Sequence, residues 1–135
     1  MARTKRTNEQ LLKEYRTFEV NATQRCNAVC EHCDRLVGVI NIRDSDVTEE
    51  QMQKAVDCMQ QVGYNPARVA IAGGEPMVNP ELNGIIRQLE RLGRNIAVLT
   101  NGVEKRPLPR PTGRRRIWYR NAPLPEKRHV PFLVS

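Results

Sequence analysis

The pattern of apolar and polar residues alternates between strand-like and helix-like stretches over most of the first hundred positions. Residues 18–22 alternate apolar and polar side chains, as a strand with one buried face does. Residues 68–72 form a short apolar run that predicts a second strand, and residues 95–100 form a third run, of the kind typical of strands buried on both faces of a parallel sheet. In the last run we expect burial on both faces for Ile96, Ala97, Val98 and Leu99.

Two apolar stripes with helical spacing separate these three runs. Thr48 and Gln51 have the spacing of a capping box, and Gly63 stands where a helix would end. The apolar positions between them lie three and four residues apart: Met52, Ala55, Val56, Met59 and Val62. Asn79 and Pro80 come in the cap-then-proline order and predict the start of the next helix. Its apolar positions are Leu82, Ile85, Ile86, Leu89 and Leu92, followed by a stop at Gly93.

The order strand, helix, strand, helix, strand predicts an α/β fold with a parallel sheet and right-handed crossovers. We further expect a short leading helix over residues 8–15 and a short fourth strand over residues 117–120. Prolines at 107, 109 and 111 rule out a regular helix before that strand. With 135 residues, the chain is too short to close a barrel of parallel strands and helices, which needs roughly 200 residues.

Charge divides the chain further. The formal net charge is +7, and residues 105–116 contain six basic side chains and no acid. Such a run is either a solvated linker or a surface for nucleic acid or another polyanion. We expect an N-terminal extension (1–16), a central half-barrel (17–104), a basic proline-rich linker (105–116) and a short strand with an irregular tail (117–135). The sequence has no secretory signal and no run of the ~20 apolar residues that a membrane span needs, so we expect a cytoplasmic protein without a membrane partner.

Three of the four cysteines stand within eight residues, at Cys26, Cys30 and Cys33. Short cysteine runs of this kind wrap iron–sulfur clusters. Three thiolates would leave one iron of a [4Fe–4S] cluster without a protein ligand. Cys58 lies in the helix predicted between Thr48 and Gly63, where it is either a buried small apolar residue or the fourth ligand of a closed zinc site.

The spacing C-x3-C-x2-C, with the ring of His32 just before the last cysteine, resembles the signature of the radical S-adenosylmethionine (SAM) superfamily. Residues 72–76, Ala-Gly-Gly-Glu-Pro, resemble the GGEP motif of that family, and residues 99–102, Leu-Thr-Asn-Gly, resemble its next strand end. The resemblance extends from about residue 18 to residue 102. It implies a partial parallel β/α barrel of about three to four βα units, incomplete at its C-terminus.

The same resemblance implies a function. The three cysteines would hold a [4Fe–4S] cluster, and SAM would bind the open iron and be cleaved reductively to a 5′-deoxyadenosyl radical. The expected contacts to SAM are Gly73, Gly74, Glu75, Pro76, Thr100 and Asn101. The implied partners are a flavodoxin-like or ferredoxin-like electron donor and an unknown substrate, for which the basic run suggests an anionic macromolecule.

Two other interpretations remain open at this stage. In the first, Cys26, Cys30, Cys33 and Cys58 hold zinc, and the basic run contacts nucleic acid. In the second, the chain is an inactive remnant or a fragment of a longer enzyme, because the strands expected to complete the barrel and to contact the adenosine of SAM are absent from it.

Overall fold

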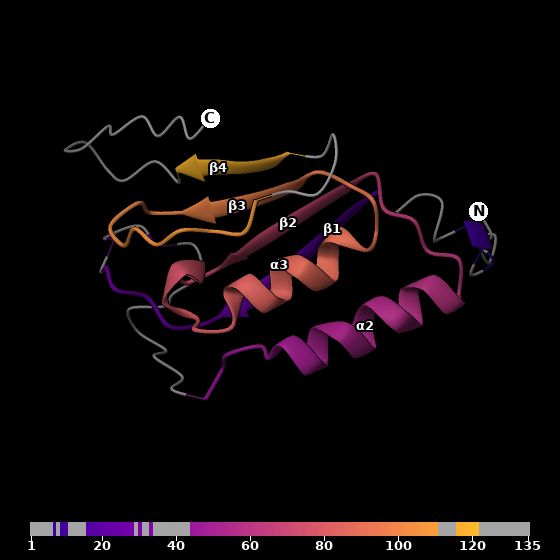
Figure 1. The fold of residues 1–135 in the computed structure, drawn as a ribbon, viewed down its shortest axis with the longest axis horizontal. Helices are drawn as coiled ribbons and strands as arrows, with labels where there is room; N and C mark the ends of the chain where they lie inside the picture. Colours follow the sequence, from indigo (N-terminus) through magenta and orange to yellow (C-terminus); the bar gives the residue numbers. More distant parts are fainter. Residues whose placement is uncertain are drawn as a thin grey trace, which may run out of the picture.

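Four parallel strands lie side by side in chain order, and their arrowheads all point to the same edge of the sheet (Figure 1). This computed structural model describes residues 7, 9–10, 16–28, 30, 33, 44–110 and 116–121. The elements are β1 (Thr17–Thr23), α2 (Glu49–Gln61), β2 (Arg68–Gly73), η1 (Pro76–Val78), α3 (Leu82–Glu90), β3 (Ile96–Thr100) and β4 (Ile117–Asn121). The predicted α/β class, the parallel sheet and the fourth strand are confirmed. The leading helix predicted over residues 8–15 lies almost entirely outside the described residues.

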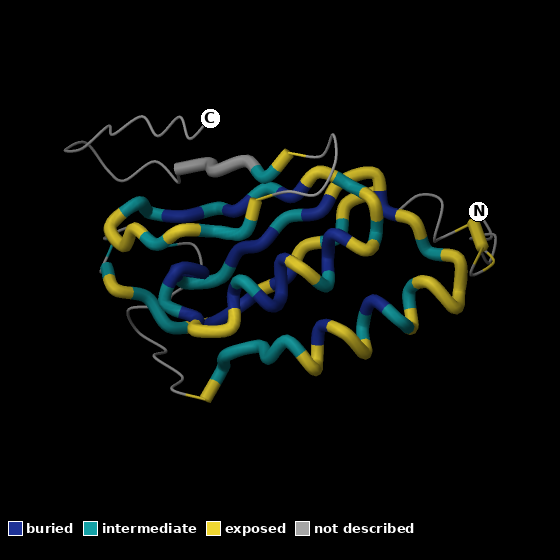
Figure 2. Tube along the Cα trace, viewed as in Figure 1, coloured by how far each residue is buried: buried dark blue, intermediate teal, exposed yellow. Residues whose placement is uncertain are grey.

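The core lies between the sheet and one helical layer formed by α2 and α3. Strand pairing places apolar side chains in rows across the sheet, such as Phe18, Val69 and Ile96, which stand opposite one another on β1, β2 and β3. These rows pack against the buried side of α3, which includes Ile85 and Leu89. Figure 2 shows the buried residues gathered on the facing sides of helices and strands.

The expectation that β3 is buried on both faces is wrong. Ile96 and Val98 are buried, whereas Ala97 and Leu99 between them are only half-buried. On β1 the alternation is sharper, because Val20 is buried and its neighbour Glu19 is exposed. The described helices therefore cover one face of the sheet, and the side chains on the other face are small or polar where they are most exposed.

The capping box predicted at Thr48 and Gln51, at the start of α2, is confirmed. The Thr48 hydroxyl accepts a hydrogen bond from the Gln51 backbone N–H at 3.2 Å, and the Gln51 side chain accepts one from the Thr48 N–H at 3.0 Å. The helix ends before Gly63, which has the positive φ of +67° expected of a residue after a helix terminus.

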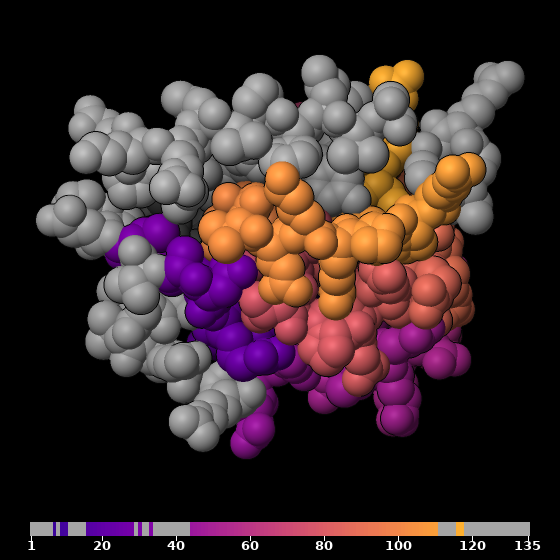
Figure 3. All heavy atoms as spheres, turned by 60° about the vertical axis from the view of Figure 1, so that its left-hand side comes forward, coloured from indigo at the N-terminus to yellow at the C-terminus, as the bar shows by residue number. Residues whose placement is uncertain are grey.

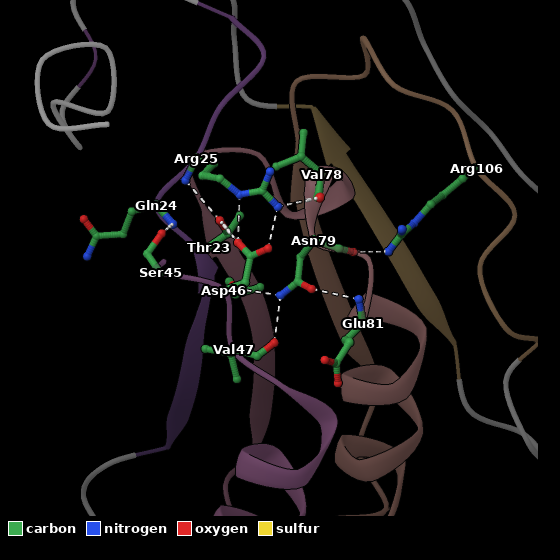
Figure 4. A network of polar contacts seen from close by, with 11 residues as sticks. Thr23, Gln24, Arg25, Ser45, Asp46, Val47, Val78, Asn79, Glu81 and Arg106 are labelled. Carbon is green, nitrogen blue, oxygen red and sulfur yellow. Dashed lines mark hydrogen bonds and ion pairs between the residues drawn. The ribbon is translucent and has the colours of Figure 1, made fainter. Parts of the chain in front are cut away.

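The start of the second helix was predicted two residues too early. A short 3-10 turn, η1, precedes Asn79, and α3 begins at Leu82. Asn79 is fully buried, and its side-chain amide donates to the carbonyls of Ala22 at 2.8 Å and Val47 at 2.9 Å. Its Oδ1 accepts from the Glu81 N–H at 2.8 Å (Figure 4). Asn79 thus joins the end of β1 to the segments that enter both helices, instead of only capping one helix.

An ion pair between Arg25 and Asp46 fixes the start of the cysteine loop (residues 26–33) beside η1 and Asn79 (Figure 4). The Arg25 guanidinium donates to both carboxylate oxygens of Asp46 and, at 3.0 Å, to the Val78 carbonyl at the end of η1. The Thr23 hydroxyl donates to Asp46 Oδ1 at 2.5 Å. The hydrogen bonds from Arg25 hold the pKa of the Asp46 carboxyl below its ordinary value, and the bond from Thr23 adds to the effect. None of these three side chains was assigned a role from the sequence.

The segment after β3 packs on the domain over part of its length. Residues 101–110 contain no helix, as the prolines predicted. The Arg106 guanidinium donates to the Asn79 carbonyl, and Leu108 packs against the hydrophobic core. The Asn83 side chain donates to the Pro107 carbonyl at 3.4 Å. This part of the basic run is therefore attached to the domain, while residues 111–115 lie outside the described part of the chain.

Among the residues that the structure describes, no helix has the length and apolar character needed to cross a membrane.

Gly73, at the end of β2, permits a close approach between strands. Its φ is +142°, and a Cβ at this position would lie 2.2 Å from the Thr23 carbonyl oxygen of β1. The pairing register of β1 and β2 shifts at this point, between Asn21 and Thr23. The absent side chain of Gly73 therefore serves the contact between strands, whereas the sequence suggested only the approach of a ligand.

We predict that Gly73→Ala lowers the free energy of unfolding by about 3 kcal/mol or more, because backbone strain and a steric clash add together. Gly63→Ala is the matched control. Its φ is also positive, but nothing lies within 4 Å of the added Cβ, so we expect a loss of about 1–2 kcal/mol. Urea unfolding of both variants measures the difference, and equal losses would contradict this account of Gly73.

We also predict that Asp46→Asn destabilises the fold by about 1–2 kcal/mol at neutral pH, a value reduced for the partial exposure of the ion pair. The folded-state pKa of Asp46 is lowered, so its stabilisation is present above the ordinary carboxyl pKa of about 4 and is lost as the pH falls through the folded-state value. Unfolding measured between pH 7 and pH 2.5 should show wild type and variant converging in acid. A constant difference would contradict the assignment.

Candidate functional site

The three stretches singled out in the sequence meet at the carboxyl edge of the sheet. The cysteine loop follows β1, the Gly-Gly-Glu-Pro turn follows β2, and Thr100 with Asn101 ends β3. Figure 3 looks toward this edge, where residues that follow β1 and residues that follow β3 lie side by side. Parallel strands bring their carboxyl ends together, and binding sites of open α/β sheets are built there.

The Glu75 carboxylate joins these strand ends. It is fully buried and accepts three hydrogen bonds: from the Met77 N–H at 2.9 Å, the Thr100 hydroxyl at 2.8 Å and the Asn101 N–H at 2.6 Å. All three donors are uncharged, and within the described residues Glu75 forms no ion pair. A buried carboxylate is thus held at the edge by uncharged donors, and no cation among the described residues pairs with it.

The backbone of the same turn is bonded to the start of the cysteine loop. The Gly74 N–H donates to the Thr23 carbonyl at 2.9 Å, and the Glu75 N–H donates to the Arg25 carbonyl at 2.9 Å. Pro76 is buried as the first residue of η1. The residue immediately before Cys26 is therefore fixed to the turn through its own carbonyl.

Thr100 and Asn101 were both predicted to face a ligand pocket. The Thr100 side chain is buried, and its hydroxyl donates to Glu75 and accepts from the Gly102 N–H at 3.1 Å. The Asn101 side chain is partly exposed, and its amide nitrogen contacts the cysteine loop, at Asn27 Oδ1 and Cys26 Sγ. Thr100 in this structure holds Glu75, and the role of both residues toward a ligand stays a prediction.

The three clustered cysteines are free thiols and are partly exposed. The Cys33 N–H donates a hydrogen bond to the Cys30 carbonyl at 3.3 Å. In the part of the chain that is described, no three or more histidine, cysteine or acidic side chains are grouped so as to hold a metal ion. The coordination geometry predicted for the loop is therefore not seen, and His32 lies outside the described residues.

Cys58 is separated from this loop. The interpretation of Cys58 as a buried small apolar residue is wrong, because its side chain is exposed on α2. The helix begins next to the end of β1, where the Val47 N–H donates to the Ala22 carbonyl at 2.9 Å, and it runs away from the carboxyl edge (Figure 1). Cys58 comes nine residues after Glu49, about 13 Å along the helix at 1.5 Å per residue. It is poorly placed to be a fourth ligand.

The chemistry of the donor set fits an iron–sulfur cluster better than structural zinc. Zinc in structural sites takes four closed ligands, whereas the cysteine loop contains three thiols and the remaining cysteine, Cys58, lies on α2. Cys26, Cys30 and Cys33 are the residues that could hold a cluster with one open iron. Sequence reasoning found these residues and Glu75, but it gave no role to Arg25 or Asp46 and saw in Asn79 only a helix start. Arg25 stands directly before Cys26 and Asn79 follows Pro76 closely, whereas Asp46 is next to none of the motifs.

The comparison with protein families matches residues 20–110 to the radical SAM superfamily. Molybdenum cofactor biosynthesis protein 1 from Homo sapiens is 28% identical over 94 residues, which are 67% of this chain and 14% of that protein. GTP 3′,8-cyclase from Peptoclostridium acidaminophilum is 31% identical over 89 residues, covering 64% and 27% of the two chains. Antilisterial bacteriocin subtilosin biosynthesis protein AlbA from Bacillus subtilis (strain 168) is 32% identical over 105 residues, covering 74% and 21%.

The chain spans between 14% and 27% of the length of these three relatives. The matched region contains the cysteine loop, the Gly-Gly-Glu-Pro turn and the end of β3, which are the three stretches gathered at the carboxyl edge. The chain belongs to the radical SAM superfamily.

Proposed function

We propose that this chain binds a [4Fe–4S] cluster through Cys26, Cys30 and Cys33, and that the open iron receives SAM. The observation that supports this most is the junction at Glu75, because it links the turn after β2 to both the cysteine loop and the end of β3. A site for two adjacent cofactors needs these three segments at fixed separations. When bound, the cluster would supply the electron that cleaves SAM to methionine and a 5′-deoxyadenosyl radical.

Glu75 is suited to attract the ammonium group of the methionyl part of SAM. A carboxylate has about four lone-pair sites, and three of those on Glu75 accept hydrogen bonds from neutral donors. The remaining site carries charge that no described cation neutralises. A charge-assisted bond to an ammonium is roughly twice as strong as a neutral one. Gly73, Gly74 and Pro76 would shape the backbone around the same group.

The substrate stays open within this proposal. The similar proteins are named as a GTP 3′,8-cyclase in one case and as a bacteriocin biosynthesis protein in another, so their names do not point to one substrate class. A flavodoxin-like or ferredoxin-like electron donor, a reducing compartment such as the cytoplasm, and an anionic macromolecule as substrate remain predictions from the sequence. Hydrogen abstraction by this chain belongs to the same proposal.

The zinc alternative is less well supported. It needs Cys58 as the fourth ligand, and Cys58 is exposed on α2, on the order of 13 Å along the helix from its start near β1. No described contact links Cys58 to the cysteine loop. We therefore keep the cluster as the proposed cofactor and use Cys58 as a control.

We predict that anaerobic reconstitution of the full chain gives about four irons and four sulfides per chain, as one [4Fe–4S] cluster requires. Single Cys26→Ala, Cys30→Ala and Cys33→Ala changes should each reduce this content severely, because each removes one of only three protein ligands. Cys58→Ala should leave iron and sulfide unchanged. Elemental and sulfide analysis, with visible absorbance, measures the content.

Tightly bound zinc in the absence of iron, lost in Cys58→Ala, would contradict the proposal and favour the four-cysteine zinc site. Wild-type iron content in all three loop variants would contradict the ligand assignment.

We predict that Glu75→Gln weakens SAM binding to the reconstituted chain about tenfold or more, because a hydrogen bond to a charged group contributes about 1.5–3 kcal/mol. The same change places an NH₂ group against a backbone or hydroxyl donor, so the free energy of unfolding should fall by about 1–3 kcal/mol. Equilibrium dialysis with labelled SAM measures the first effect, and urea unfolding the second.

Glu50→Gln removes an exposed carboxylate on α2 and is the matched control for this test. An unchanged dissociation constant for Glu75→Gln, measured on protein with a full cluster, would show that the carboxylate does not contact the ammonium group.

A further inference from the structure

The Asn101 side chain has only one orientation that satisfies its neighbours. Its Oδ1 accepts a hydrogen bond from the Val103 N–H at 3.0 Å. The NH₂ end must therefore face the cysteine loop, where Nδ2 lies 2.9 Å from Asn27 Oδ1 and 3.7 Å from Cys26 Sγ. A flipped amide would place two acceptors together at Asn27 and would lose the bond to Val103.

The position of this amide is fixed by the buried carboxylate. The Asn101 backbone N–H donates to Glu75 Oε2 at 2.6 Å, and Thr100 before it donates to Glu75 Oε1. The side chain is thus held at both its backbone and its Oδ1. A donor fixed in this way needs little reorganisation to stay bonded when the sulfur that it faces carries negative charge.

Cys26 is the exception among the three clustered thiols. Within the described residues, neither Cys30 Sγ nor Cys33 Sγ receives a side-chain hydrogen bond, whereas Cys26 Sγ receives the one from Asn101. A hydrogen bond to a ligating sulfur stabilises negative charge on it, and reduction adds an electron to the cluster. Hydrogen bonds to sulfur are among the factors that set cluster potentials.

We propose that Asn101 donates an N–H···S hydrogen bond to the Cys26 thiolate ligand and thereby raises the reduction potential of the cluster. This inference rests on the proposed function, because it needs a cluster on Cys26. It assigns Asn101 a role toward the cluster as a positioning and tuning residue, in addition to the contact with SAM that the sequence resemblance implies.

The test is a redox titration of the reconstituted full chain, followed by EPR of the reduced cluster. Asn101→Leu removes the donor without adding charge. Asn101→Asp keeps the acceptor for the Val103 N–H and replaces the donor with an oxygen. Both variants should show a midpoint potential more negative than that of the wild type, with a larger shift for the aspartate.

Asn65→Asp is the matched control for charge. Asn65 lies between α2 and β2, away from the carboxyl edge, and its side chain accepts from the Arg94 guanidinium at 2.9 Å. The same chemical change there should leave the potential unchanged. Wild-type potentials in both Asn101 variants, on protein with a full cluster, would overturn the inference while the proposed function stands.

A second measurement does not depend on the Asn101 variants holding a cluster. Wild-type protein labelled with ¹⁵N in its asparagine side chains should show a ¹⁵N coupling to the reduced cluster in pulsed EPR, and the coupling should persist in Asn27→Asp. No coupling in the wild type would overturn the inference. A chain that assembles no [4Fe–4S] cluster under any condition would contradict the proposed function itself, and this inference with it.

Discussion

The carboxyl edge of this sheet depends on one buried negative charge. A carboxylate without exposure to water is costly unless its oxygens accept hydrogen bonds, and Glu75 obtains three, from η1, from the Thr100 side chain and from the backbone after β3. The bonds from Thr100 and Asn101 fix a segment that is distant in sequence, and the bond from Met77 fixes the adjacent turn. The turn after β2, the end of β3 and, through Asn101, the first cysteine are therefore positioned together.

A second set of contacts holds the same edge from the helical side. Asn79 and the ion pair of Arg25 with Asp46 join the start of the cysteine loop to the segments that enter α2 and α3. The hydrophobic core lies on that side of the sheet alone among the described residues. The hydrophobic core thus holds the sheet against the helices. The polar contacts of Glu75, and those of Asn79 with the Arg25–Asp46 ion pair, fix where the loops leave the sheet.

Much of the fold could be predicted from the sequence because it depends on local signals. The capping box at Thr48, the spacing of apolar residues in α3 and the glycines after the helices each act over a few residues. The predictions were wrong where contacts between segments that are distant in the sequence determine the structure. Leu99 is half-buried because the helices among the described residues cover one face of the sheet, and Asn79 bonds to β1 instead of starting α3. Likewise, the motifs located the candidate site, but the sequence could not indicate that Glu75 holds β3 or that Cys58 is exposed.

The central claim is that three thiols at this edge hold a cluster whose fourth iron is open to an external ligand. The EPR spectrum of the reconstituted, reduced chain, recorded with and without SAM, tests it most directly. The account predicts that SAM changes the g values of the reduced [4Fe–4S] cluster, because a new ligand at one iron alters its electronic structure. Identical spectra, from protein with a full cluster and saturating SAM, would contradict the account.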